Sequence, residues 1–241
     1  MIDELWADGP RFVDAKGVYR IGTDSVLLAY FANDTGIKKK TLAADLGCGS
    51  GIISILLATL NQNLTVDAIE LLPEAAESAR KSAELSGVKH KINVIESDLR
   101  NHREYLRPGA YDLVVANPPY YALGTGALSD DTARRTARSE LTCSLEDILS
   151  AAGYLTRWGG SFSLVHKPER LCDVFRAMNK HGIEPKRMRL VQNKADSPPS
   201  LALIEGRRGG KPSLKIEAPL ILRNSDDTDS DEINKIYHRN L

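Results

Sequence analysis

Residues 41–58 read TLAADLGCGSGIISILLA, and this stretch decides the fold. Its first six residues form a short apolar run that predicts a buried strand, and the run from Ile52 to Ala58 predicts the start of a helix. The glycines between them let the backbone turn tightly and let a ligand approach closely. These glycines are Gly47, Gly49 and Gly51. Their G-x-G-x-G spacing differs from the G-x-G-x-x-G of dinucleotide-binding enzymes.

Carboxylates stand at the ends of the first three predicted strands. Asp45 comes just before the glycines, where it could meet a ligand amine. Glu70 ends the second predicted strand, about the distance onward at which an acidic residue binds ribose hydroxyls in nucleotide-binding folds. Taken alone, Glu70 could be an exposed surface charge, but its place at a strand end after a glycine loop favours the ribose role. Asp98 follows the third predicted strand and either accepts a hydrogen bond from an adenine amino group or caps the next turn.

A second motif, Asn117-Pro118-Pro119-Tyr120, follows the apolar run from Tyr111 to Ala116, which predicts another buried strand. Two prolines exclude both helix and strand pairing, so the chain leaves the sheet abruptly at the edge where open α/β sheets bind ligands. The Asn117 amide oxygen and the Pro118 carbonyl are both acceptors. Together they could hold both hydrogens of an amino group while Tyr120 stacks on the ring that carries it. The alternative is a simple proline turn after a strand.

The rest of the chain alternates predicted helices and strands. Helices are predicted over residues 73–86, 100–106, 145–155, 168–181 and 231–239, and strands over residues 65–69, 92–96, 161–165, 186–192 and 201–205. Ser144 is the expected N-cap of the helix at 145–155. Trp158-Gly159-Gly160 is expected to be the turn into the strand at 161–165.

The N-terminal segment carries a short apolar run, residues 26–32, which predicts a helix. Its expected N-cap is one of three preceding polar residues, Thr23, Asp24 or Ser25. This helix either covers one edge of the sheet or closes as a lid over a cofactor, and the pattern alone slightly favours the cover.

Two basic regions could bind a phosphate backbone. The long polar loop at 121–143 contains three arginines, which either clamp phosphates or belong to a mobile solvated loop. Residues 157–215 hold thirteen Lys/Arg against five Asp/Glu, although the whole chain has zero net charge. This excess is either ordinary helix-surface charge or a surface for nucleic acid. The candidate RNA-binding residues are Tyr121, Arg134, Arg135, Arg138, Lys167, Lys186, Arg187 and Arg189.

Composition is that of a soluble globular protein, with 42% apolar and 27% charged residues. Three scattered cysteines and the absence of a signal-peptide pattern predict a cytoplasmic protein with reduced thiols. No spacing of His, Cys and carboxylates predicts a metal site. The longest apolar stretch is too short to span a bilayer.

With these two motifs, the chain resembles the class I S-adenosylmethionine-dependent methyltransferases. Residues 45–51 resemble their motif I, and Asn117-Pro118-Pro119-Tyr120 resembles motif IV of the branch that methylates amino groups. Within this branch the chain is most similar to the bacterial valine-tRNA adenine-37 N6-methyltransferases. The features that carry this similarity are residues 19–28, the Asn-Pro-Pro-Tyr-Tyr form, residues 137–140, residues 185–189 and the acidic tail.

The resemblance implies an α/β fold, a Rossmann-like seven-stranded methyltransferase sheet with helices on both faces, in a single domain. It implies a cap or lid at residues 1–40, a core at 41–223 and a tail at 224–241 with a possible short helix. It implies S-adenosylmethionine as cofactor, tRNA as substrate, no membrane partner, and a catalytic set of Asn117, Pro118 and Tyr120. The implied cofactor-binding residues are Thr23, Asp24, Ser25, Asp45, Gly47, Cys48, Gly49, Gly51, Glu70, Asp98 and Asn117. Oligomeric state stays open between monomer and weak dimer.

Three other functions share parts of this pattern. A release-factor glutamine methyltransferase also uses Asn-Pro-Pro-Tyr, but such enzymes carry a larger helical domain before motif I, where this chain has 44 residues. An rRNA guanine N2-methyltransferase would carry an appended recognition domain. A non-catalytic RNA-binding module would usually lose glycines or the motif IV asparagine, and all of these are present.

Overall fold

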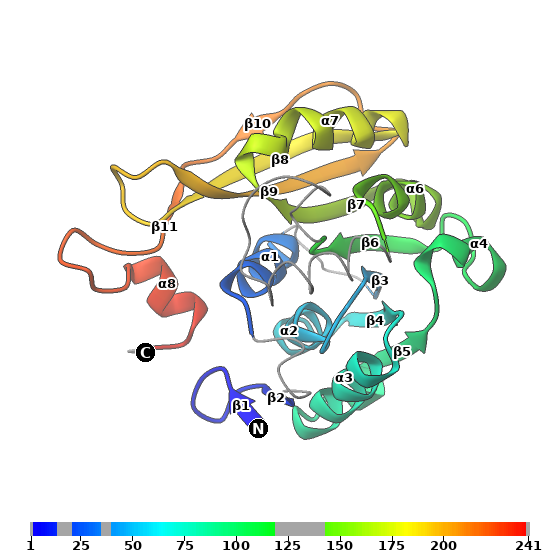
Figure 1. The fold of residues 1–241 in the computed structure, drawn as a ribbon, viewed down its shortest axis with the longest axis horizontal. Coiled ribbons are helices and arrows are strands. Elements are labelled where there is room, and N and C mark those ends of the chain that lie inside the picture. The colour runs from blue at the N-terminus through cyan, green and yellow to red at the C-terminus, as the bar shows by residue number, and fades with distance from the viewer. Residues whose placement is uncertain (1, 14–20, 35–39, 119–142, 240–241) are drawn as a thin grey trace, which may run out of the picture.

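The computed structural model describes residues 2–13, 21–34, 40–118 and 143–239. Within those ranges, the central sheet has nine strands in the order β10-β8-β9-β7-β6-β3-β4-β5, with β11 also pairing with β8 (Figure 1). The strands β5, β4, β3, β6 and β7 are parallel, and β9 is antiparallel to both β7 and β8. The bounds are β3 Thr41–Leu46, β4 Leu64–Glu70, β5 Ile92–Glu96, β6 Tyr111–Ala116, β7 Thr156–His166, β8 Ile183–Gln192, β9 Pro199–Arg208, β10 Lys215–Ile216 and β11 Leu220–Ile221.

The predicted α/β class and the seven long strands are confirmed. The two-residue strands β10 and β11 lengthen the sheet beyond the prediction, because two residues are too few to show a period in sequence. The prediction of a turn at Trp158-Gly159-Gly160 was wrong, since β7 already begins at Thr156. The pairing register with β6 shifts between Tyr111 and Leu113, so the extra residues form an irregularity inside the strand.

Two layers of helices cover the sheet. One core cluster joins the strands to α1 (Thr23–Asn33), α2 (Ile52–Leu60) and the short C-terminal α8 (Asp231–Ile236), and it also includes Ala83 of α3 (Pro73–Leu85). The other cluster joins them to α6 (Leu145–Leu155) and α7 (Leu171–Lys180). Helices on both faces are therefore confirmed. The short helical turns are η1 Lys89–Lys91, η2 Leu99–Asn101, α4 His102–Tyr105 and η3 Pro168–Arg170.

Local chemistry explains where α6 and α3 begin, whereas it fails at α1. Ser144 and Asp147 form a reciprocal capping box at the start of α6, as predicted. Pro73 opens α3 at its first turn. The predicted N-cap of α1 was wrong, because Gly22 occupies that position with no side-chain cap and Thr23 to Ser25 lie inside the first turn.

An N-terminal hairpin, β1 (Ile2–Glu4) and β2 (Arg11–Val13), packs against α3. The backbone nitrogens of Arg11 and Val13 donate to the hydroxyls of Ser86 and Ser82, each at 2.9 Å. No sequence pattern predicted this hairpin, since each of its strands has only three residues. It fixes the start of the chain beside the helix that follows β4.

Candidate active site

The glycine turn lies between β3 and α2 and is built as the sequence predicts. The backbone nitrogens of Gly47 and Cys48 both donate to the Ile69 carbonyl at 2.9 Å, which ties the turn to the end of β4. Gly47 has φ of 72° and Gly51 has φ of 82°, in the left-handed region that disfavours side chains. A Cβ on Gly51 would also come within 3.1 Å of the Ala79 side chain.

Glu70 is a brace for this turn rather than an exposed surface charge. Its side chain is buried, and its two carboxylate oxygens accept hydrogen bonds from Gly49 N at 2.8 Å and Leu72 N at 2.9 Å. The carboxylate therefore has a fixed position beside the glycines. Each of its oxygens can accept a further hydrogen bond.

Asp45 is fully buried beneath the turn. Its Oδ2 accepts from the backbone nitrogen and the hydroxyl of Ser54, at 3.1 and 2.6 Å, whereas its Oδ1 is buried without a hydrogen-bond partner in the described part of the chain. Burial raises the pKa of Asp45 to about 7, and the nearby Glu70 charge adds to the rise while Ser54 opposes it. An unsatisfied buried carboxylate oxygen points to a cationic or hydrogen-bond-donating ligand.

Asp98 caps the next turn, which is one of its two expected roles. Its side chain accepts from the Arg100 backbone nitrogen at 2.9 Å and pairs with the Arg100 guanidinium at 3.0 and 2.5 Å. This guanidinium lowers the pKa of Asp98. The contact with an adenine amino group stays a prediction.

Asn117 and Pro118 follow β6 directly beside the glycine turn. Ala116 and Leu46, the last residues of β6 and β3, are register partners in adjacent parallel strands, so the two motifs leave the sheet at the same level. The Asn117 side-chain nitrogen donates to the Ser25 hydroxyl at 2.8 Å, which brings the first turn of α1 to the same place. Pro118 is buried. Tyr120, the other predicted catalytic residue, lies outside the described residues.

The candidate RNA-binding residues divide into two groups. Four of them, Tyr121, Arg134, Arg135 and Arg138, lie outside the described residues. The other four are placed, and each is engaged with another part of the chain. Lys167 Nζ donates to the Ser200 carbonyl at 3.3 Å, and Lys186 Nζ to the Lys211 carbonyl at 2.8 Å.

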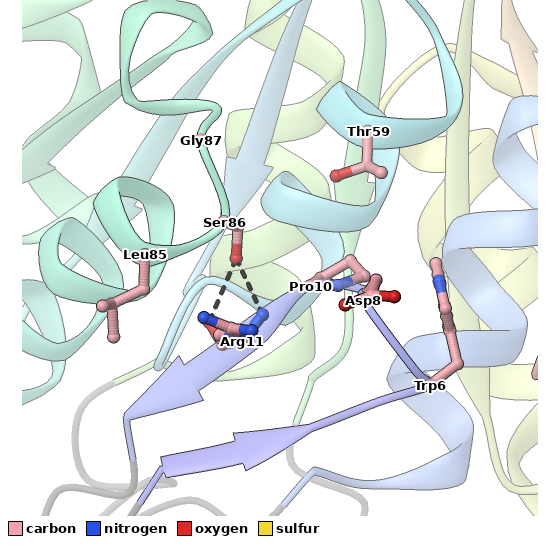
Figure 2. Close-up of a pocket in the computed structure, with 9 residues that line it drawn as sticks. Trp6, Asp8, Pro10, Arg11, Thr59, Leu85, Ser86 and Gly87 are labelled. Carbon is pink, nitrogen blue, oxygen red and sulfur yellow. Dashed lines mark hydrogen bonds between the residues drawn. The ribbon is translucent and has the colours of Figure 1, made fainter.

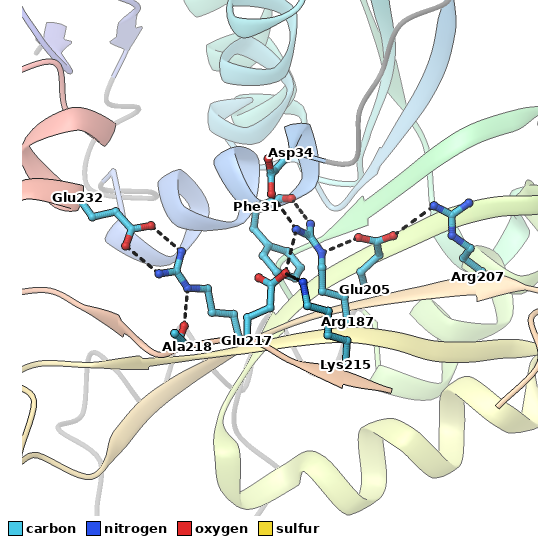
Figure 3. Close-up of polar contacts among 10 residues, drawn as sticks. Phe31, Asp34, Arg187, Glu205, Arg207, Lys215, Glu217, Ala218 and Glu232 are labelled. Carbon is cyan, nitrogen blue, oxygen red and sulfur yellow. Dashed lines mark hydrogen bonds and ion pairs between the residues drawn. The ribbon is translucent and has the colours of Figure 1, made fainter. Parts of the chain in front are cut away.

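Arg187 and Arg189 bind carboxylates within the chain, and Figure 3 shows the contacts of Arg187. The Arg187 guanidinium pairs with Glu205 at 2.9 Å and Asp34 at 3.0 Å, and it stacks on the Phe31 ring at 3.9 Å. Arg189 forms a two-pronged pair with Glu232, at 2.5 and 2.7 Å. These contacts tie β8 to α1 and α8, which favours a structural role for both arginines over contact with a phosphate.

His166 is a buried ionisable residue that the sequence did not single out. It ends β7, two residues beyond Leu164, the register partner of Ala116. Burial and the nearby Arg170 lower the pKa of His166 to about 4, so the ring is neutral at pH 7. A lone histidine at the end of an apolar strand belongs to no motif. Its place at the end of a strand next to β6 was the available sign that it lies near Asn117.

A pocket of about 350 Å³ lies between the N-terminal hairpin and the last turns of α2 and α3 (Figure 2). Trp6, Arg11, Thr59 and Ser86 contribute to its lining. Because α2 and α3 begin at the carboxyl ends of β3 and β4, their last turns lie at the opposite edge of the sheet from Asn117. This pocket is therefore separate from the candidate active site.

None of the helices in the described ranges has the length and apolar content needed to cross a membrane. Within those ranges, no three His, Cys, Asp or Glu side chains gather in a group that could hold a metal ion.

The strand order, the glycine turn and the Asn-Pro turn beside it define a Rossmann-like fold of the methyltransferase type. A predicted O-methyltransferase from Agrobacterium tumefaciens has a similar fold, with a TM-score of 0.73 at 22% identity over 91% of this chain and 100% of that one. A putative RNA methyltransferase from Pyrococcus horikoshii superposes with a TM-score of 0.55 at 17% identity, over 76% of this chain and 82% of that one.

The chain belongs to the methyltransferase small domain family, whose family model matches residues 12–135. Among its relatives is a tRNA1(Val) (adenine(37)-N6)-methyltransferase from Photorhabdus laumondii, 34% identical over 163 residues. That match covers 67% of this chain and 64% of the relative, so the chain spans slightly less than two thirds of the relative's length.

Proposed function

We propose that the protein transfers a methyl group from S-adenosylmethionine to the exocyclic N6 of an adenine in tRNA, at position 37 of a valine tRNA. The observation that carries the proposal is the meeting of the two motifs. Asn117 and the glycine turn leave adjacent strands at one level, with register partners Leu46 and Ala116 immediately before them. A methyl donor on the turn and an amine held by Asn117 would therefore lie side by side.

The residues of the turn fit S-adenosylmethionine. The unpartnered Oδ1 of Asp45 would suit the amino group of the methionine part, and the buried Glu70 carboxylate would suit ribose hydroxyls. The glycines, with Cys48 among them, leave the backbone open to close approach, since a Cβ on Gly47 would have no atom within 4 Å. Asp98 is the proposed adenine contact, and the first turn of α1, residues 23–25, is proposed to close over the cofactor, with the Ser25 hydroxyl directed to Asn117 instead.

Bound S-adenosylmethionine would supply an electrophilic methyl group on a sulfonium sulfur. The chain's own residues would prepare the amine that receives it. The lone pair of an exocyclic adenine amine is delocalised into the ring, which makes the amine a poor nucleophile. If the Asn117 oxygen and the Pro118 carbonyl accept the two hydrogens of the amine, the nitrogen would become pyramidal. Its lone pair would then point out of the plane of the ring and be free to attack. Positioning and charge placement then provide most of the rate gain.

The substrate assignment rests on the basic residues and on the relative named as a tRNA1(Val) (adenine(37)-N6)-methyltransferase. Lys167 and Lys186 are the proposed RNA contacts among the described residues, together with Tyr121 and the arginines at 134, 135 and 138. A base in an anticodon loop is already partly unstacked, so presenting it to the site costs less than flipping it from a duplex. We further propose that residues 1–40 act as a cap, 41–223 as the catalytic core, and 224–241 as a tail that steadies it. Such an enzyme would work in the cytoplasm.

The test is transfer of a labelled methyl group from S-adenosylmethionine to three acceptors, which are unmodified valine tRNA, a release-factor protein and unrelated RNA. Label on the valine tRNA is expected. Label on the release factor would move the assignment to glutamine methylation. Cofactor binding with no label on any acceptor would contradict the tRNA assignment and favour a non-catalytic module.

A further inference from the structure

Ser25 and Asn117 are 92 residues apart in sequence, yet their side chains meet in the candidate active site. The Asn117 Nδ2 donates a 2.8 Å hydrogen bond to the Ser25 Oγ. Ser25 lies half-buried in the first turn of α1, and Asn117 lies one residue after β6. The contact joins the N-terminal segment to the residue that is proposed to hold the substrate amine.

The chemistry of an amide side chain makes this contact consequential. One end of the amide is an acceptor oxygen and the other is a donor NH2, and a half-turn of the last side-chain torsion exchanges them with little change in shape. Only one orientation offers the oxygen to a substrate amine. In the other orientation the Asn117 NH2 faces the NH2 of the substrate and cannot accept a hydrogen from it. A hydroxyl can accept from the NH2 or donate to the oxygen, and in this structure the Ser25 hydroxyl accepts from Nδ2, which turns the amide oxygen the other way.

We propose that Ser25 is a positioning residue whose hydroxyl holds the Asn117 amide in the orientation that accepts a hydrogen of the substrate amine. The inference rests on the proposed function, because that function gives Asn117 its substrate. It assigns Ser25 a role distinct from contact with the cofactor.

Helix α1 is held firmly enough to give the Ser25 hydroxyl a fixed position. Its apolar face is buried in the core, with Val26, Leu27 and Leu28 almost wholly inaccessible. Near its other end, Arg187 Nη2 donates to the Phe31 carbonyl at 2.6 Å, and Arg187 Nη1 pairs with Asp34 at 3.0 Å. The helix is therefore anchored at the end far from Asn117, so the position of the Ser25 hydroxyl relative to the sheet is fixed.

The first test compares Ser25→Ala with Ser25→Thr, which keeps a hydroxyl. One hydrogen bond contributes roughly 1 kcal/mol, so we expect Ser25→Ala to lower kcat about 5-fold. The Kd for S-adenosylmethionine should stay within about 2-fold, and Ser25→Thr should recover most of the rate. Thr59→Ala is the matched control, because it removes a helix hydroxyl at the far end of α2, where it donates to the Ile55 carbonyl at 2.8 Å. A fall in cofactor affinity equal to the fall in kcat would overturn the proposal.

The second test places Ser25→Ala in an Asn117→Asp background. A carboxylate offers an oxygen in both orientations, so it has no amide to orient. We expect the Ser25→Ala effect on kcat to disappear in that background. A loss of the same factor as in the wild-type background would show that Ser25 acts through something other than the Asn117 amide, and would overturn the proposal.

A third readout needs no substrate. The side-chain NH2 resonances of Asn117, assigned from their loss in Asn117→Asp, report the hydrogen bond directly. Slow exchange with solvent in the wild type and faster exchange in Ser25→Ala are expected, while unchanged exchange would overturn the proposal. A wild-type protein that methylates no tRNA would contradict the proposed function, and the Asn117 resonances would still show whether the Ser25 hydroxyl holds the Asn117 amide.

Discussion

Glu70 accepts a 2.8 Å hydrogen bond from the backbone nitrogen of Gly49, so the residue that ends β4 holds the glycine turn that follows β3. Its second oxygen accepts from Leu72 N at 2.9 Å. The glycine turn, which is proposed to bind the cofactor, and the proposed ribose ligand are thus one hydrogen-bonded unit, and a change at Glu70 affects both.

Replacement of Glu70 by Gln should weaken S-adenosylmethionine binding by at least about 10-fold, because an amide NH2 would face one of the two backbone donors and leave it unsatisfied. Titration calorimetry measures the Kd. Glu77→Gln, a change at an exposed helix position, is the control. Equal affinity of the Glu70→Gln variant and the wild type would exclude Glu70 from the cofactor site.

Replacement of Asn117 by Ala should abolish methyl transfer and leave S-adenosylmethionine affinity within a few-fold. The amide oxygen is proposed to act on the substrate amine, which the cofactor does not need for binding. Single-turnover rates and cofactor titration separate the two effects. Loss of both in equal measure would contradict the role given to Asn117.

Cofactor affinity should depend on pH through Asp45, whose pKa is raised to about 7. A cationic ligand favours the ionised carboxylate, so affinity should rise roughly 5- to 10-fold between pH 6 and pH 7.5. Asp45→Asn should bind more weakly and with a flat profile over that range. A wild-type profile as flat as that of the variant would contradict an ionising Asp45.

The same shift predicts how the stability of the ligand-free protein changes with pH. The folded state keeps a proton on Asp45 up to about pH 7, whereas the unfolded chain loses it near its ordinary pKa of about 4. Between these two pKa values the folded state therefore binds more protons than the unfolded chain. The contribution of Asp45 to the free energy of unfolding then falls as pH rises, by up to ~1.4 kcal/mol per pH unit. Urea unfolding of the wild type and Asp45→Asn at pH 5 and pH 7 measures the difference. The sign of the prediction would be wrong if the wild type gained stability over the variant as pH rose.

Replacement of Arg187 by Ala should cost about 3 kcal/mol of unfolding free energy, because it removes the guanidinium at 2.9 Å from the buried Glu205 carboxylate and leaves Arg207 at 3.9 Å. Arg176→Ala is the control, since Arg176 is 78% exposed and should contribute no more than ~0.5 kcal/mol. Denaturant unfolding measures both. An unchanged stability with a weaker tRNA affinity would return Arg187 to the RNA-binding residues.

The sequence predicted those parts of the site that depend on neighbours in the chain. The strand at Thr41–Leu46 was predicted to the residue, because an apolar run, three glycines and a helix follow one another without interruption. The same holds for the capping box at Ser144, where both partners lie within one turn. Local chemistry determines these features, so it can be read locally.

The remaining features depend on contacts between distant segments. No pattern links Ser25 to Asn117, and only the folded sheet brings α1 to the end of β6. Arg187 belongs to a basic stretch in sequence, but Glu205 and Asp34 reach it from a neighbouring strand and from the end of α1. Trp158 to Gly160 have turn-forming composition, yet they lie inside β7, as extra residues between Thr156 and Ser161, which pair with β6.

The most direct test of the central claim identifies the modified nucleoside. Valine tRNA treated with the protein and S-adenosylmethionine is digested to nucleosides and analysed by mass spectrometry, beside the same tRNA with adenine-37 changed to guanine. The account predicts one N6-methyladenosine per tRNA in the first sample and none in the second. A methylated base that persists after the change, or a methyl group on a base other than adenine, would contradict it.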